Sequence, residues 1–136
     1  MSIQYKNAGI WLLRLIAAFI LIHTLFFKFS ASEESVYIFT ETGMEPWGRI
    51  GTGIAELVAA ILILVPVTTW IGSLMGIGLM SGAIFFHLTK LGIVVKNDGG
   101  LLFIYALVVL MCCVILLLIN RQQIRQVLRE TGIIKS

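Results

Sequence analysis

Three residues that can exchange protons, His23, Glu56 and His87, stand inside long apolar stretches of the sequence. Such a side chain in a membrane span costs on the order of a few kcal/mol and by default marks a functional site. Counted from the ends of their apolar stretches, the three residues lie at a similar depth. A carboxylate and imidazoles in a partly dry site have proton affinities that their surroundings tune. We therefore predict one polar pocket that binds a ligand or carries protons.

Three basic residues lie closer to the water than this polar layer: Lys28, Arg49 and Lys90. They would close the pocket with positive charge. The same layering also arises in a purely structural arrangement, in which Glu56 pairs with Lys28 or Arg49 and each histidine bonds to a backbone or hydroxyl group. Both interpretations remain open at this point.

Arg14 precedes His23 by nine residues, so the two side chains point to opposite sides of a helix. Arg14 also lies near the other end of its span. We expect it to snorkel to the interface, with support of a partner residue as the alternative. Arg14 and Lys28 share one helix face, but periodicity does not say whether that face or the His23 face looks inward.

The elements that carry these residues are membrane helices. Of the 136 residues, 59% are hydrophobic and only 12% are charged, which excludes an ordinary soluble domain. Four continuous apolar runs are long enough to cross a bilayer, and none alternates as barrel strands do. We predict an all-α, four-helix transmembrane bundle in a single domain, 1–136. The predicted spans are about 9–29, 48–66, 69–91 and 100–119, followed by an interfacial tail, 120–136.

Charge bias predicts the orientation and the loops. The first loop is acidic, whereas the two ends of the chain are basic. The positive-inside rule then predicts that both termini are cytoplasmic. We expect the protein in the inner membrane. Within the first loop, Ser32 can cap a short outer-surface helix that stops at Gly43. The charges that decide the bias are Glu33, Glu34, Glu41 and Glu45 in the loop, and Lys6, Arg121, Arg125, Arg129 and Lys135 at the ends.

Small residues in the third span predict close helix packing. Gly72 with Gly76, and Gly78 with Gly82, have small-xxx-small spacing, which we assign to packing within the bundle, a homo-oligomer seam being the alternative. The adjacent pair Cys112 and Cys113 has neither redox nor metal-site spacing, so we expect it to fill the core. The net charge of +3 forms no basic patch with interleaved aromatics, so a nucleic-acid partner is excluded. No residue set has the spacing of a metal site.

Together, the spans resemble those of the DoxX and DoxX-like family of four-helix membrane proteins. The matching segments are LLRLIAAFILIHTLFFKF (12–29), GTGIAELVAAILILVPVTTW (51–70), FFHLTKLG (85–92) and NDGGLLFIYALVVLM (97–111). One departure is the pair Phe26 and Phe27, where family members often have glycine before the first-helix lysine. The positions that carry the resemblance are Arg14, Lys28, Glu56, His87, Asn97, Asp98, Gly99 and Gly100.

The resemblance implies a lipid-soluble ligand. Some relatives are membrane subunits linked to thiosulfate:quinone oxidoreduction or to thiol-stress complexes. The fold is also similar to four-helix sterol isomerases and sigma-2-type receptors, which hold an apolar ligand between helices. As supporting residues of a pocket we carry over Arg14, Arg49, Asn97 and Asp98.

Our leading hypothesis is a membrane subunit that supports a quinone-linked or thiol/sulfur oxidoreductase through this pocket. Glu56 and His87 would carry protons, and a bound quinone is the candidate cofactor. The sequence has no CxxC pair and no GxGxxG, so electrons would come from a redox-protein partner. The alternatives are a lipid or sterol-like binding or transport module and a non-catalytic assembly or anchor protein. Haem ligation by His23 and His87 is disfavoured, and whether the chain is itself an enzyme stays open.

Overall fold

The fold was analysed in a computed structural model that describes residues 3–135, with the backbone alone for residues 3–6. Lys6 of the charge bias and Ser136 of the predicted tail therefore lie outside the described side chains. Every regular element in the described range is helical, which confirms the all-α prediction. The elements are α1 (Ile3–Phe29), α2 (Glu33–Glu41), α3 (Trp47–Leu64), α4 (Thr69–Phe86), the π-helical turn η1 (His87–Leu91), α5 (Leu101–Ile119) and α6 (Arg121–Glu130).

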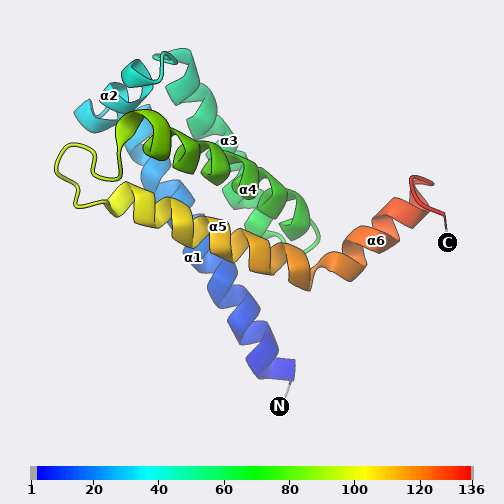
Figure 1. The fold of residues 1–136 in the computed structure, drawn as a ribbon. Helices are drawn as coiled ribbons and strands as arrows, with labels where there is room; N and C mark the ends of the chain where they lie inside the picture. The colour runs from blue at the N-terminus through cyan, green and yellow to red at the C-terminus, as the bar shows by residue number, and fades with distance from the viewer. Residues whose placement is uncertain (1–2, 136) are drawn as a thin grey trace.

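Four of these helices are long and apolar enough to cross a membrane, as predicted. The spans cover Asn7–Phe29, Trp47–Leu64, Thr69–Leu91 and Leu101–Ile119. They form a ring in which α1 and α4 each pack against both α3 and α5 (Figure 1). Large apolar side chains cover the outside of the ring; Phe19, for example, is 70% exposed. Because such a surface is unfavourable in water, it contacts the lipid bilayer.

Glycines set the distance between neighbouring helices on one side of the ring. A Cβ atom added to Gly72 would lie 2.7 Å from the backbone nitrogen of Ile63 on α3. One added to Gly76 would lie 2.6 Å from the Sγ of Cys113 on α5. These two glycines therefore serve packing inside the bundle. Gly78 and Gly82, by contrast, have no neighbour within 4 Å of such an atom.

Helix α2 lies across the end of the bundle away from the termini, where it contacts α1, α3 and η1 (Figure 1). The hydroxyl of Ser32 accepts a hydrogen bond from the backbone N–H of Ser35 at 3.2 Å, which confirms the predicted cap. The helix ends at Glu41, and Gly43 follows with a positive φ of 75°. Ser35 and Phe39 are buried, so α2 has a face directed into the bundle.

The loop between η1 and α5 is organised around Asp98. Its Oδ1 accepts hydrogen bonds from the backbone N–H groups of Val95 and Gly100, at 3.0 and 2.8 Å, and its Oδ2 accepts from Leu102 at 3.2 Å. Lys96 and Asn97 have positive φ angles of 51° and 61°, a conformation that side chains rarely adopt. The carboxylate thus caps the first turn of α5 and holds a strained turn in place.

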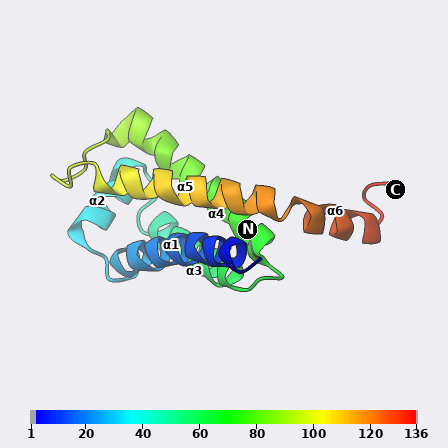
Figure 2. The same cartoon turned by 90° about the horizontal axis from the view of Figure 1, so that it is seen from below.

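Helix α6 continues past the end of α5, away from the bundle (Figures 1 and 2). Arg121, Arg125 and Arg129 are exposed along it. One tie to the bundle is a 3.1 Å hydrogen bond from Gln123 Nε2 to the carbonyl oxygen of Val67, in the α3–α4 connection. An interfacial tail remains our prediction for this helix.

Candidate functional site

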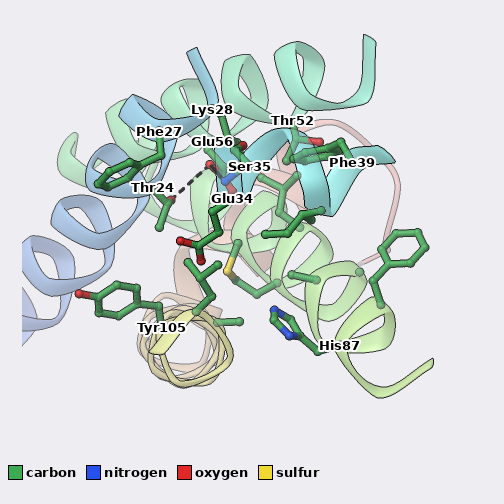
Figure 3. A pocket seen from close by; sticks show the side chains of 18 of the residues that line it. Thr24, Phe27, Lys28, Glu34, Ser35, Phe39, Thr52, Glu56, His87 and Tyr105 are labelled. Atoms are coloured by element: carbon green, nitrogen blue, oxygen red, sulfur yellow. Dashed lines mark hydrogen bonds and ion pairs between the residues drawn. The ribbon is translucent and has the colours of Figure 1, made fainter. Parts of the chain in front are cut away.

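A cavity of about 410 Å³ lies beneath α2, at the end of the bundle away from the termini (Figure 3). Its lower part is apolar, with Leu21 from α1, Met80 from α4 and Ala106 from α5. Its upper part carries polar groups on several elements. The polar lining side chains are His23, Thr24, Lys28, Ser32, Glu34, Ser35, Thr42, Thr52, Glu56, His87, Asp98 and Tyr105.

One ion pair joins α1 to α3 in the wall of this cavity. The Nζ of Lys28 lies 3.1 Å from the Oε2 of Glu56, and the two side chains are 15% and 3% exposed. The hydroxyl of Thr24, one turn before Lys28, lies 3.4 Å from the same Oε2 and 3.1 Å from the carbonyl oxygen of Leu21. A deeply buried carboxylate therefore has a matched cation beside it, as burial of a charge requires.

Arg49 does not pair with Glu56, although it is buried. Its Nε donates to both carboxylate oxygens of Glu45, at 2.9 and 3.0 Å, and its Nη1 donates to the carbonyl oxygen of Lys28. Arg49 does not border the cavity. It binds the backbone of Lys28 at the end of α1, and the ammonium group of Lys28 does border the cavity. Arg49 therefore supports the position of Lys28.

His87 lines the cavity from η1, where it is 5% exposed (Figure 3). Its Nδ1 lies 2.8 Å from the carbonyl oxygen of Gly92. Because a carbonyl oxygen can only accept, Nδ1 carries a proton, and Nε2 is the acceptor of the neutral ring. The ring also packs edge-on against Phe103, at 5.6 Å between centroids. The π-helical turn thus holds Nδ1 of His87 in a hydrogen bond to the backbone.

Glu34 enters the cavity from α2, which our sequence interpretation did not foresee (Figure 3). Burial, and then the charge of Asp98, raise the pKa of Glu34 above its usual value. Burial would also raise the pKa of Asp98, but the backbone N–H groups of Val95, Gly100 and Leu102, with a contribution from His87, outweigh it and lower that pKa. The sequence did contain one indication of this position. Glu34 precedes Ile38 by four residues, so the two side chains share one face of α2, and that face looks inward.

His23 lies at the edge of the cavity and is exposed. Its ring stacks on Phe19 at 6.0 Å and meets Phe27 and Tyr105 edge-on, at 5.2 and 6.0 Å. Phe27 and Tyr105 lie on the side of the cavity between α1 and α5 (Figure 3). Of the two phenylalanines that depart from the family pattern, Phe27 borders the cavity and Phe26 does not.

Besides Arg49, three predicted residues do not border the cavity. Lys90 and Asn97 are exposed and do not border the cavity, because η1 and the following turn direct them outward. The extension of Arg14 to the interface stays a prediction. The residue does not border the cavity and is 7% exposed. It shares the face of α1 that carries the core residues Ala17 and Leu21, so this face and not that of His23 looks inward. The lining hydroxyls of Thr24, Thr52 and Tyr105 were missed, because hydroxyl residues are common on membrane helices and carry no charge signal.

The arrangement suits a small amphipathic molecule. Its volume falls in the range of about 300–1,000 Å³ typical of ligand pockets, and its apolar base with convergent polar groups is also typical of them. No group of three or more His, Cys, Asp or Glu side chains in the described part of the chain could hold a metal ion. The head group of a ligand would meet Lys28, Glu34 and His87, and its apolar part would lie along the helices below.

Comparison with known proteins agrees with the fold. The family model of the DoxX-like family matches residues 12–119, which include all four spans apart from the first residues of α1. No curated protein and no solved structure matches the chain. The match covers most of the sequence and includes the Lys28–Glu56 pair, His87 and the Asp98 turn. The chain is a multi-pass membrane protein that belongs to the DoxX-like family.

Proposed function

We propose that this protein binds a lipid-soluble molecule with a polar head group in the cavity beneath α2, and that the molecule is of the quinone class. The observation that carries the proposal is the buried Lys28–Glu56 pair in the wall of an otherwise mainly apolar cavity of about 410 Å³. A packed bundle core has no need of such a pair, because well-packed apolar residues would be as stable or more so.

The polar lining favours a head group that accepts hydrogen bonds. The ammonium of Lys28 and the hydroxyls of Thr52 and Tyr105 are donors that border the cavity. Glu34 joins them when it is protonated, which its raised pKa favours. Quinone carbonyl oxygens are acceptors and would fit these groups. A bound quinone would supply two-electron redox chemistry, and the side chains would hold its head group and exchange protons with it.

A role in a quinone-linked or thiol/sulfur oxidoreductase system follows from this binding. A separate redox protein would deliver the electrons, while this chain presents the bound molecule near one face of the membrane. We also propose that both termini are cytoplasmic, which puts the cavity in the outer half of the inner membrane. Reporter fusions at residue 136 and in the loop before Trp47 test this orientation: activity of a cytoplasmic reporter only in the loop fusion contradicts it.

The test of ligand binding is mass spectrometry of the solvent extract from protein purified in mild detergent. Glu56→Gln should lose a stoichiometric quinone that the natural sequence retains. Glu45→Gln is the matched control, because Glu45 is also ion-paired, with Arg49, but does not border the cavity. A sterol or another lipid lost in the same pattern supports the alternative of a lipid-binding module. Bulk phospholipid alone in all three preparations contradicts ligand binding and favours an assembly role.

A further inference from the structure

Arg14 is a buried cation at the end of the bundle opposite the cavity. It is 7% exposed, and its Nε is enclosed without a hydrogen-bond partner among residues 7–135. In the same part of the chain the ion pairs are those of Lys28 with Glu56 and of Arg49 with Glu45, so Arg14 has no carboxylate beside it. Taking an unpaired charge out of water is unfavourable. A counter-charge from outside the chain would remove this cost.

The acidic side chains among residues 7–135 do not supply that counter-charge at the depth of Arg14. Of its seven acidic residues, all but Glu130 belong to α2, to Glu45 and Glu56 near the cavity, or to the Asp98 turn. Lys28, which pairs with Glu56, lies fourteen residues beyond Arg14, or about 21 Å along α1. Glu130 is on α6, where it accepts a hydrogen bond from Gln126 at 3.1 Å. Apart from Glu130, the acidic side chains therefore lie at the end of the molecule opposite Arg14.

The position of the guanidinium points to a membrane surface as the source of negative charge. Its Cζ lies 4.8 Å from the centre of the Trp11 ring, so the side chain runs back toward the N-terminus of α1. Trp11 is 42% exposed, on the lipid-facing side of α1. An exposed tryptophan of this kind sits at the level of the lipid head groups. The first turns of α1 extend beyond the bundle at this end (Figure 1).

We propose that Arg14 binds the phosphate of one phospholipid from the leaflet on the side of the termini. The guanidinium nitrogens other than Nε would donate to phosphate oxygens, a geometry in which arginine forms paired, charge-assisted bonds. Trp11 packs against the cation and against the glycerol region of the lipid. This site is separate from the cavity beneath α2, and it holds a structural lipid that fixes α1 against the bundle.

The test counts lipids on the detergent-purified full chain by native mass spectrometry. The probes are dioleoyl-phosphatidylglycerol and dioleoylglycerol, which has the same acyl chains but no phosphate. We expect one tightly held phosphatidylglycerol per chain and about tenfold weaker binding by Arg14→Gln, as the loss of a charge-assisted hydrogen bond predicts. Arg125→Gln is the control, because Arg125 is an exposed arginine on α6. It should retain the lipid.

Three results would overturn the proposal. The first is equal retention of both probes by the natural sequence, a comparison that needs no variant to fold. The second is unchanged phosphatidylglycerol binding in Arg14→Gln. The third is occupation of Arg14 by something else: full displacement of the lipid by millimolar inorganic phosphate would assign the site to a free anion, and a co-purified acidic protein lost only in Arg14→Gln would assign it to a protein partner.

Discussion

Lys28 of α1 and Glu56 of α3 form an ion pair of 3.1 Å between Nζ and Oε2, in the wall of the cavity and only 15% and 3% exposed. The pair joins two neighbouring helices at the depth where a ligand would place its head group. It is therefore both a structural contact and the electrostatic centre of the proposed binding site. The two roles can be separated by experiment.

Removing one member of this pair should destabilise the protein more than removing both. Lys28→Met leaves the carboxylate of Glu56 buried without a cation, which costs about 3–5 kcal/mol. The double variant Lys28→Met with Glu56→Leu should recover most of that loss, while ligand retention stays abolished. The coupling is measured by thermal unfolding, in one detergent, of the natural sequence, the single variants Lys28→Met and Glu56→Leu, and the double variant. Additive effects of the two changes would mean that the pair does not interact.

The position of α2 over the cavity should depend on pH through Glu34. The pKa of Glu34 in the folded protein is raised, so its contribution to stability is present below the unfolded value of 4.5 and is lost as pH rises through the higher folded value. Hydrogen exchange of α2 amides, corrected for intrinsic rates, should therefore be slower at pH 4 than at pH 7. Glu34→Gln should remove this difference.

The control for that measurement is Glu33→Gln. Glu33 occupies the same helical turn but is exposed and does not border the cavity. This variant should keep the pH dependence of the natural sequence. An equal effect of the two substitutions would show that general charge on α2, and not the burial of Glu34 near Asp98, controls the helix.

Asp98→Ala should loosen the start of α5. The change removes the acceptor of three backbone N–H groups, those of Val95, Gly100 and Leu102. Loss of a helix cap costs about 0.5–2 kcal/mol. Because the folded pKa of Asp98 is lowered, its contribution is present above the unfolded value of 3.8 and is lost as pH falls through the lower folded value. Exchange rates of the Gly100 and Leu102 amides measure the effect, which Asn97→Ala should not reproduce.

Gly72→Ala should force α3 and α4 apart. The added Cβ would lie 2.7 Å from the backbone nitrogen of Ile63, and a backbone atom cannot rotate away as a side chain can. Overpacking of this kind costs about 1–3 kcal/mol. Gly78→Ala, on the same helix with no atom within 4 Å, should instead be neutral or stabilise by up to about 1 kcal/mol. A Gly72→Ala protein as stable as the Gly78→Ala protein would contradict the close approach.

The sequence by itself determined the four spans, the α2 cap at Ser32 and the glutamate of the central ion pair. Apolar runs of this length have one stable solution in a bilayer, a helix that satisfies its own backbone, so length and composition suffice for the spans. A buried carboxylate needs a cation, so Glu56 predicted a basic partner and narrowed it to Lys28 or Arg49. Only the three-dimensional structure distinguishes these two, because it pairs Arg49 with Glu45.

Tertiary structure alone decided which helix faces look inward. In a membrane helix the lipid-facing and the core-facing sides are both apolar, so periodicity does not distinguish them. For this reason the sequence did not show that Arg14 is enclosed and that His23 is exposed. Tertiary structure also brought Glu34 over the cavity and turned Lys90 away from it, because the fold of the connecting segments places these two side chains. Membrane helices follow from local chemistry, whereas a site between them depends on how their faces and loops meet.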